Sequence, residues 1–308
     1  MDNSAWSKQR PVKKKIRTTS DVILFKSIGY PLLFIFAVLC LVPFILIIMC
    51  SFTDEEMIIR FGYNLWPRKF SLGSYQAVFQ NPTSILRAYG VTGLVTVVGT
   101  TLGVFINTMT GYVLQRKDFR WRNKFSFFFF FTTLFSGGLA PWFILCVKYL
   151  HFNDSLLGLF VPTLVSVWNI LLVKGFMAGI PFEITESAKI DGAGDFTVFT
   201  KLIIPLSKPV IATIGLFTAL NLWNDWYHSM LFINNDKLYS LQYLLYKLVN
   251  DAKALRQIME EAGLEVETAP IEGMKMALTV VVTGPIILLY PFVQRYFVKG
   301  LTLGSVKG

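Results

Sequence analysis

One short aromatic segment carries the polar side chains whose spacing is best suited to binding. Four of them are spaced at i, i+3, i+4 and i+7, which predicts one face of a helix: Asn221, Asn224, Asp225 and His228. Three aromatic residues flank that face: Trp223, Trp226 and Tyr227. Amides and a carboxylate can hydrogen-bond hydroxyl groups, and indole rings can stack on a pyranose. The segment therefore predicts a path for a sugar-like solute, the alternatives being a sealed subunit interface or an interfacial aromatic belt.

Residue patterns for catalysis are weak by comparison. The sequence has no G-x-x-x-x-G-K-[ST] phosphate loop, so we expect this chain not to bind ATP itself. His151 and His228 are the only histidines, and neither has metal-ligand spacing to another ligand-type residue. Cys40, Cys50 and Cys146 lie in apolar runs without paired spacing, which indicates packing. An enzyme embedded in the membrane is thus unsupported, and we expect no catalytic residue, metal or cofactor on this chain.

The elements that must position these residues are long and apolar. The chain has 308 residues, of which 54% are hydrophobic and only 16% charged. A helix needs about 20 apolar residues to cross a bilayer. Six runs satisfy that length: 29–51, 88–112, 125–147, 156–178, 210–233 and 276–298. The sequence therefore predicts an all-α polytopic membrane protein, with a basic tail at 1–28, six transmembrane helices within 29–298 and a second tail at 299–308.

The net charge of +10 is explained by its distribution. If the N-terminus lies in the cytoplasm, 19 of the 29 Lys and Arg residues but only 7 of the 19 acids fall on the inner side, in 1–28, 113–124, 174–209 and 295–308. An excess of Lys and Arg marks cytoplasmic loops. We expect both termini in the cytoplasm and no nucleic-acid partner. The apolar run after the basic tail is longer than that of a signal peptide and no small-x-small cleavage site follows it, which argues against cleavage.

Two other patterns bear on packing and on the outer surface. Gly99 and Gly103 are four apart, with Gly93 and Gly111 on either side, and small residues at that spacing let membrane helices approach closely, within one subunit or between two. The outer side would hold the segments 52–87 and 234–274. The second contains DAKALRQIMEEAGLEVETA, which predicts a short amphipathic, acidic helix.

A charged segment at 181–207 separates two of the apolar runs. Pro181 suits a first helical turn, and Gly192 and Gly194 should end that helix. Asp195 can cap a second helix, which Pro205 should stop. The segment therefore predicts a helix–bend–helix on the cytoplasmic side, with no catalytic group, and a solvated surface loop is the alternative.

The spacing within this segment resembles the cytoplasmic signature of binding-protein-dependent ABC importer permeases. In that signature Glu-Ala-Ala is followed three residues later by Gly, and Ile-x-Leu-Pro begins after nine more. The matching positions here are Glu186, Ser187, Ala188, Gly192, Leu202, Ile204 and Pro205, with Ser187, Leu202 and Ile204 departing from the pattern. The ending KGLTLGSVKG also resembles maltose-type sugar permeases. SGGLAPWF at 136–143 and NLWNDWYHSMLF at 221–232 resemble the branch for complex oligosaccharides.

The resemblance implies a type I ABC importer permease in the inner (plasma) membrane of a prokaryote. It implies a second permease, an extracellular solute-binding protein that delivers a carbohydrate, and two ATPase subunits that use ATP and Mg²⁺. It also implies that an ATPase contacts two groups of residues. These are the signature positions Glu186, Ser187, Ala188, Gly192 and Pro205, and the tail positions Gly300, Thr302, Gly304 and Lys307.

An ion-coupled secondary carrier is the main alternative function. Such a carrier usually needs ionisable residues near mid-membrane, and Asp225 is the only Asp or Glu inside a predicted span. Inverted repeats with paired broken helices are typical of many carriers, and no internal repeat is visible. A pure scaffold would not need the signature spacing of the 181–207 segment.

Overall fold

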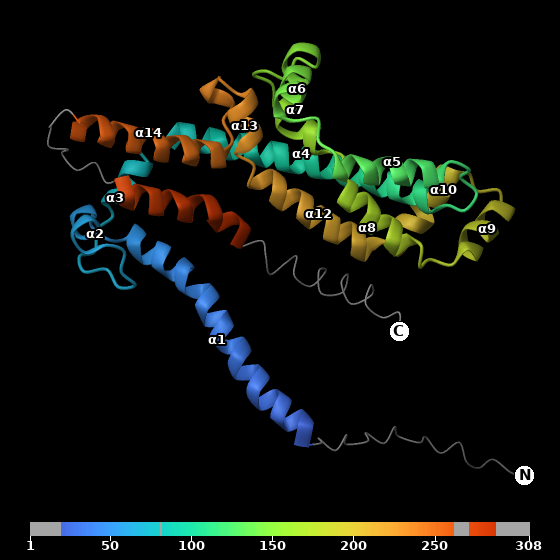
Figure 1. Cartoon of the computed structure of the whole chain (residues 1–308), viewed down its shortest axis with the longest axis horizontal. Helices are drawn as coiled ribbons and strands as arrows, with labels where there is room; N and C mark the ends of the chain where they lie inside the picture. Colours follow the sequence, from blue (N-terminus) through green and yellow to red (C-terminus); the bar gives the residue numbers. More distant parts are fainter. Residues whose placement is uncertain (1–19, 81, 262–270, 288–308) are drawn as a thin grey trace, which may run out of the picture.

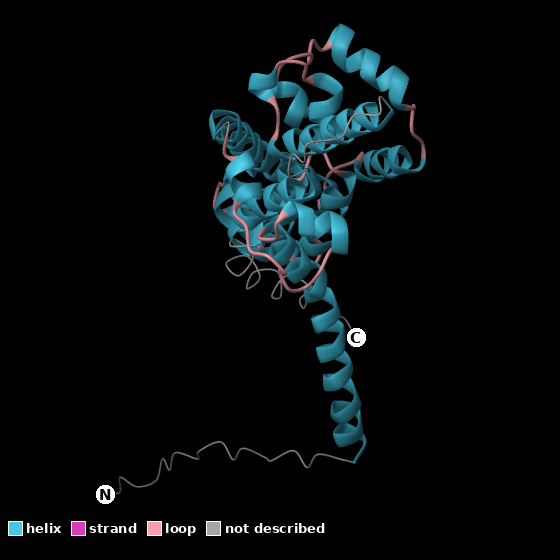
Figure 2. Cartoon of the chain, turned by 90° about the vertical axis from the view of Figure 1, so that its left-hand side faces the viewer, coloured by secondary structure: helices cyan, strands magenta, loops and turns pink. Residues whose placement is uncertain are grey.

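The fold is helical throughout the part of the chain that the computed structural model describes, residues 20–80, 82–261 and 271–287. In these ranges every regular element is a helix, and Thr53 and Phe70 form an isolated antiparallel bridge. Figure 2 shows the helices and the short loops between them. The prediction of an all-α polytopic membrane protein is confirmed.

Two helices are long and apolar enough to cross a bilayer unbroken: α1 (Ser20–Ser51) and α4 (Pro82–Gln115). Three pairs of helices, each bent at a short break, also pass the test of length and composition when their two parts are taken together, so that up to five spans lie in the described residues. The first part of the sixth expected span is the helix at 271–287, and the rest of 276–298 lies outside the described residues. Helices therefore lie at the predicted apolar runs in the described residues, but those at 125–147, 156–178 and 210–233 are broken.

The bent pairs fill the middle of the chain. The first joins α5 (Arg122–Leu134) at 114° to α6 (Leu139–Ile144) and the π-helical η1 (Leu145–Tyr149). The second joins α7 (Leu156–Phe160) and η2 (Val161–Thr163) at 44° to α8 (Val167–Met177). The third joins the segment Asp195–Leu206, which is part of the 181–207 segment, at 84° to α12 (Lys208–Trp223). Of this pair only α12, together with α13 (Tyr227–Phe232) after it, corresponds to the expected fifth span at 210–233.

Helix α4 is the centre against which α8 and α12 pack (Figure 1). A Cβ on Gly99 would lie 2.7 Å from a methyl carbon of Leu222 on α12. A Cβ on Gly111 would lie 2.7 Å from Cγ1 of Val173 on α8, and one on Gly103 would lie 3.3 Å from a backbone oxygen. These three glycines allow close packing within one subunit, as the spacing predicted. Gly93, by contrast, faces open space.

The break in the second bent pair is held by a side chain of α4. Asn107 is fully buried, and its amide nitrogen donates to the carbonyl of Leu164 at 2.9 Å. Its amide oxygen accepts a hydrogen bond from the backbone N–H of Ser166 at 2.9 Å. Backbone groups inside a membrane must find partners in the protein, and Asn107 supplies them where the helix stops.

At one end of the molecule the short helices α2 (Glu55–Phe61) and α3 (Gly73–Val78) lie near α14 (Leu241–Glu261) and the helix at 271–287. The 3-10 helix η4 (Asp236–Leu238) contacts α4. The buried carboxylate of Glu55 accepts hydrogen bonds from the backbone N–H groups of Glu272 (2.9 Å) and Gly273 (2.7 Å). The amphipathic helix expected at 251–269 is in fact the second half of α14 as far as Glu261, because α14 begins at Leu241, and the remainder lies outside the described residues.

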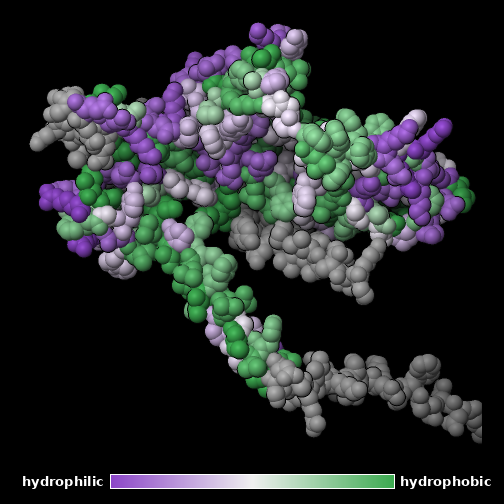
Figure 3. Space-filling model, in the orientation of Figure 1, coloured by the Kyte–Doolittle hydropathy of each residue, from purple (hydrophilic) through white to green (hydrophobic). Residues whose placement is uncertain are grey.

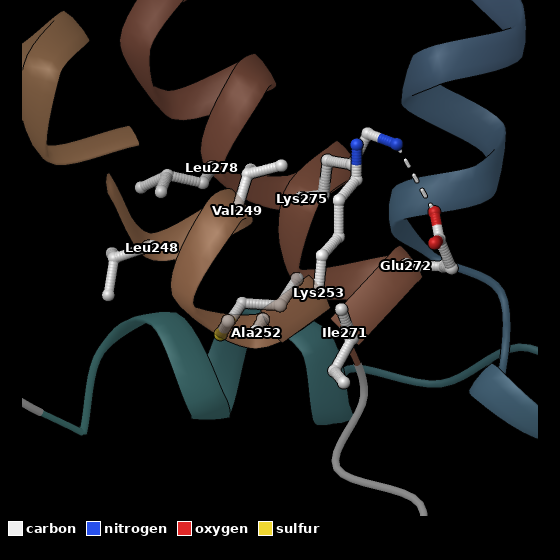
Figure 4. Close-up of a pocket in the computed structure, with 9 residues that line it drawn as sticks. Leu248, Val249, Ala252, Lys253, Ile271, Glu272, Lys275 and Leu278 are labelled. Carbon is white, nitrogen blue, oxygen red and sulfur yellow. Dashed lines mark hydrogen bonds and ion pairs between the residues drawn. The ribbon is translucent and has the colours of Figure 1, made fainter. Parts of the chain in front are cut away.

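Helix α14 and the helix at 271–287 meet along an apolar seam. Leu248 and Ala252 face Ile271 and Leu278 around a pocket of about 10 Å³ (Figure 4). At its edge the Lys275 ammonium lies 3.3 Å from the Glu272 carboxylate. The seam is closed by side chains and leaves too little space for a solute.

Helix α1 extends away from the other helices (Figure 1), and its apolar side chains are exposed along most of its length. Figure 3 shows this hydrophobic surface on α1. Hydrophilic residues gather over α2 at one end of the molecule, over α9 (Phe182–Ile190) at the other, and also over the upper middle of this view.

The glycine contacts lead to a stability prediction. Gly111→Ala places a methyl group against Val173 and a backbone carbonyl, so we expect a loss of about 1–3 kcal/mol from overpacking. Gly93→Ala is the matched control, because the same methyl group enters open space and alanine favours a helix by about 1 kcal/mol. Thermal unfolding in detergent should therefore lower the Tm of the first variant and not of the second. Equal Tm values would contradict the packing role.

Candidate functional site

The 181–207 segment is a helix, a bend and a second helix. Helix α9 follows Pro181, which is its N-cap, and ends before Asp191. Gly192 then has a φ of +83°, a conformation that glycine adopts without strain. The chain continues as α10 (Asp195–Val198), the π-helical η3 (Phe199–Ile203) and α11 (Ile204–Leu206). The predicted bend at Gly192 is confirmed.

Three local expectations about this segment are wrong. Pro181 precedes the first helical residue instead of lying in the first turn. Gly194 is the N-cap of α10, and Asp195 is its first residue, whose carboxylate bonds to another loop. Pro205 does not stop the second helix, because it occupies the first turn of α11 after a π-helical turn, where its missing N–H is tolerated. The chain turns at Ser207 instead.

The inner face of the segment is packed against the membrane helices. Val198, Phe199 and Ile203 are buried in a cluster with Tyr112 of α4 and with residues of α8. The rings of Phe199 and Tyr112 are stacked, with centroids 5.3 Å apart. Ala188 of the signature is partly buried against the same cluster. A shift of α4 or α8 therefore has to move the segment with it.

A network of charges fixes the edge of the segment. Arg116, just after α4, donates to the carboxylate of Asp195 at 2.7 Å and also pairs with Asp118. Lys189 of α9 lies 3.3 Å from both carboxylates. Hydrogen bonds from Arg116 lower the pKa of Asp118 and the pKa of Asp195. The Asp118 and Asp195 side chains are 41% and 61% exposed, and pairs with exposed carboxylates contribute little to stability, so their effect is to set the position of α9 and α10 relative to α4.

The opposite face of the segment is open. Glu186, Ser187, Gly192 and Pro205 are exposed, which leaves four of the five signature residues available to a partner. Two large apolar side chains stand beside them, Ile190 at 82% and Phe196 at 65% exposure. The sequence analysis did not single out either residue, although an isoleucine and a phenylalanine on either side of the Gly192 bend could have indicated an apolar contact surface there. An exposed apolar pair rimmed by polar residues indicates a protein contact.

The second candidate site, at 221–228, is not one helical face. Helix α12 ends at Trp223 and α13 begins at Tyr227. Asp225 lies between them and accepts hydrogen bonds from the backbone N–H groups of Tyr227 (3.0 Å) and His228 (3.1 Å). Its other oxygen lies 2.5 Å from Nδ1 of His228. The prediction that the four polar residues lie on one helical face is therefore wrong, because the Asp225 carboxylate accepts hydrogen bonds from the first turn of a new helix.

The remaining residues of this segment point in different directions. Trp223 donates its indole N–H to the carbonyl of Val282 at 3.3 Å. Asn224 accepts from Gln242 of α14 at 3.0 Å. Trp226 stacks on Tyr246 of α14, with ring centroids 4.6 Å apart. These aromatic and amide groups hold α12 to its neighbours, and Asn221 is exposed. The tail residues Gly300, Thr302, Gly304 and Lys307 lie outside the described residues.

Tyr227 and His228 instead face the broken third span. Tyr227 lines a groove together with residues 136–139, Pro141, Trp142 and Leu145, and the groove has a volume of about 620 Å³. The His228 ring lies edge-on to Trp142, with centroids 5.8 Å apart. The SGGLAPWF motif therefore contributes to the same surface as the 221–228 segment.

Comparison with known proteins identifies the fold and its relatives. Residues 99–303 match the family described as "Binding-protein-dependent transport system inner membrane component". The polygalacturonan/rhamnogalacturonan transport system permease protein YtcP of Bacillus subtilis is 39% identical over 285 residues, which cover 92% of this chain and 99% of that protein. Protein LplC of the same organism is 37% identical over 270 residues, covering 87% and 90%.

A solved structure supports the same placement. One chain in the crystal structure of a bacterial ABC transporter involved in the import of the acidic polysaccharide alginate superposes with a TM-score of 0.77 and 27% identity. The match covers 91% of this chain and 98% of that one.

The charge network leads to a prediction about local order. Arg116→Met removes the donor that joins Asp195 and Asp118, so amide hydrogen exchange across 182–198 should quicken, while α4 is unchanged. Arg120→Met is the matched control, because the Arg120 guanidinium lies over the Trp121 ring in the same loop. Both carboxyl groups have lowered pKa values in the folded chain, so their contribution is present above about pH 4 and is lost as the pH falls below it. Equal exchange in the two variants would contradict the positioning role.

Proposed function

The chain belongs to the family of inner membrane components of binding-protein-dependent transport systems, and from this we propose that it imports an oligosaccharide fragment of an acidic polysaccharide. It is the permease subunit of an ATP-binding-cassette importer. One observation carries the assignment to this chain: the 181–207 segment presents its signature residues outward while its inner face is packed on the membrane helices. The substrate class follows the relatives, whose names include polygalacturonan, rhamnogalacturonan and alginate.

The 181–207 segment is proposed to be the coupling element that docks on a cytoplasmic ATPase. Glu186 and Ser187 would supply polar contacts there, and Ile190 and Phe196 an apolar anchor. Because Phe199 stacks on Tyr112, closure of two ATPase subunits on ATP and Mg²⁺ would displace α4 and α8 as well. A rigid element that moves with its partner is a common way to transmit such a change. The tail residues Gly300, Thr302, Gly304 and Lys307 are proposed to reach the same ATPase pair.

The opposite end of the molecule is proposed to face outward. There the helices within 52–78 and α14 offer a hydrophilic surface to a solute-binding protein (Figure 3). Both termini would lie in the cytoplasm of a prokaryote, since the basic loop at 113–124 adjoins the proposed coupling element. A second permease would complete the pathway.

An ion-coupled carrier is not favoured. One oxygen of the Asp225 carboxylate accepts two backbone hydrogen bonds and the other pairs with His228, so both oxygens are engaged in holding α13 and its surroundings in place.

The function is tested in proteoliposomes that contain this chain with its co-encoded permease, ATPase and binding protein. We expect uptake of labelled trigalacturonate that requires internal ATP and survives proton and sodium ionophores. Uptake that persists without ATP but collapses with an ionophore would favour the carrier. If no acidic oligosaccharide is taken up while a neutral one is, the proposed substrate class is wrong.

The coupling role is tested at Gly192. Gly192→Val forces a β-branched residue into a positive φ, which costs about 1–3 kcal/mol, so we expect loss of ATPase assembly and uptake with normal membrane insertion. Gly194→Val is the matched control, because Gly194 has a φ of −69° and, like Gly192, has nothing within 4 Å of its Cβ position. Co-purification and uptake assays measure both effects. Normal coupling in Gly192→Val would reject the role.

A further inference from the structure

The third span is interrupted where a membrane helix should continue. Helix α5 ends at Leu134 and α6 starts at Leu139, with an angle of 114° between the two parts. Gly138 has a φ of +86°, and its N–H donates to the Ser136 hydroxyl at 3.2 Å. All of residues 135–138 are exposed. Irregular backbone is tolerated at membrane depth where it is buried in protein or lines a water-filled cavity, so this break needs a polar neighbour.

The break forms one side of the groove described above. Its volume of about 620 Å³ lies within the range of small-molecule sites, roughly 300–1,000 Å³. Its lining is mainly apolar, with Leu139, Pro141 and Leu145, and it also includes the exposed residues 136–138 at the break. Apolar walls with a few convergent polar groups are typical of ligand sites.

Two aromatic rings, one from α6 and one from α13, also line the groove. Tyr227 and Trp142 both line it, and each lies edge-on to the His228 ring, with centroids 5.9 Å and 5.8 Å away. Asp225 holds His228 through Nδ1 and also caps α13, so the aromatic group is fixed in orientation. Behind it, Phe232 is fully buried in the core cluster that joins α13 to α4 and α7. The groove is therefore a preformed surface on a packed support.

We propose that this groove is a subsite for one pyranose ring of the transported oligosaccharide. The apolar face of the ring would stack on Tyr227 and Trp142. Hydroxyl or carboxylate oxygens of the sugar would accept hydrogen bonds from the Ser136 hydroxyl, which accepts from Gly138 and has its own O–H to donate, and from backbone N–H groups at the break. The inference rests on the proposed function and names the residues of this subunit that contact its substrate. The solute path thus crosses from α13 to the third-span break instead of following one helix.

The first experiment compares the KM for trigalacturonate uptake in the assembled transporter. Loss of a stacked aromatic ring is worth about 0.5–1.5 kcal/mol, so Tyr227→Ala should raise the KM about 2- to 12-fold. Tyr227→Phe keeps the ring and should stay within about twofold of the wild type. Tyr149→Ala is the matched control, since Tyr149 is 73% exposed at the end of η1 and is not among the groove residues. Basal ATPase activity should be equal in the wild type and in Tyr149→Ala.

A second measurement does not depend on kinetics. Ser136→Cys in a Cys40→Ser background should react with a polar maleimide, and trigalacturonate should slow that reaction at least threefold during turnover, while neutral maltotriose has less effect. If the reaction is blocked with or without sugar, the groove is a subunit interface and the proposal is overturned. Should Tyr227→Ala fail to assemble, the protection measurement at position 136 decides.

The possible results distinguish the proposed function from the proposed subsite. A wild-type transporter that takes up no acidic oligosaccharide overturns the proposed function and the subsite with it. Wild-type uptake with an unchanged KM in Tyr227→Ala and no protection of the cysteine at position 136 overturns the subsite alone. A raised KM together with protection supports both.

Discussion

Every interrupted span in this protein has to satisfy its own backbone, because hydrocarbon offers no hydrogen-bond partners. The second bent pair meets that requirement through Asn107, whose amide bonds to both sides of the break between η2 and α8. The fifth span does so through Asp225, which caps α13. In the third span the Ser136 hydroxyl accepts from Gly138. The same polar side chains that permit the breaks thereby determine where irregular backbone can exist in the membrane.

Helix α4 makes these breaks compatible with a compact bundle. Its glycines bring α12 and α8 close enough for Leu222 and Val173 to contact its backbone. Gly99 lies beside the core cluster that supports the groove lined by Tyr227. Gly111 lies beside the cluster that holds the proposed coupling segment at 181–207. One straight helix therefore packs against both functional regions. Packed side chains on α4 therefore connect the two regions. Whether a shift in one region moves the other is a question for coupling measurements.

The two functional regions differ in how they are built. The 181–207 segment buries aromatic rings on one face and exposes its signature on the other, so its shape is maintained while its outer surface stays available. The groove near Tyr227 is apolar with a polar edge, and the capped helix α13 fixes its rings. A moving contact with a large protein requires the first arrangement, and passage of a hydrated sugar requires the second.

Local patterns in the sequence determined the helical membrane class, the position of the apolar runs, the bend at Gly192 and the close approach along Gly99 and Gly111. Each depends on composition, spacing or the conformational range of one residue. Tertiary structure decided the rest. Asn221, Asn224 and Asp225 have helical spacing, yet the helix ends at Trp223, and Asp225 accepts hydrogen bonds from the first turn of the next helix. Arg116 pairs with Asp195 across 79 positions, and Tyr227 meets the break at Gly138 across a similar distance. Such contacts depend on how separate helices pack, which no local pattern in the chain encodes.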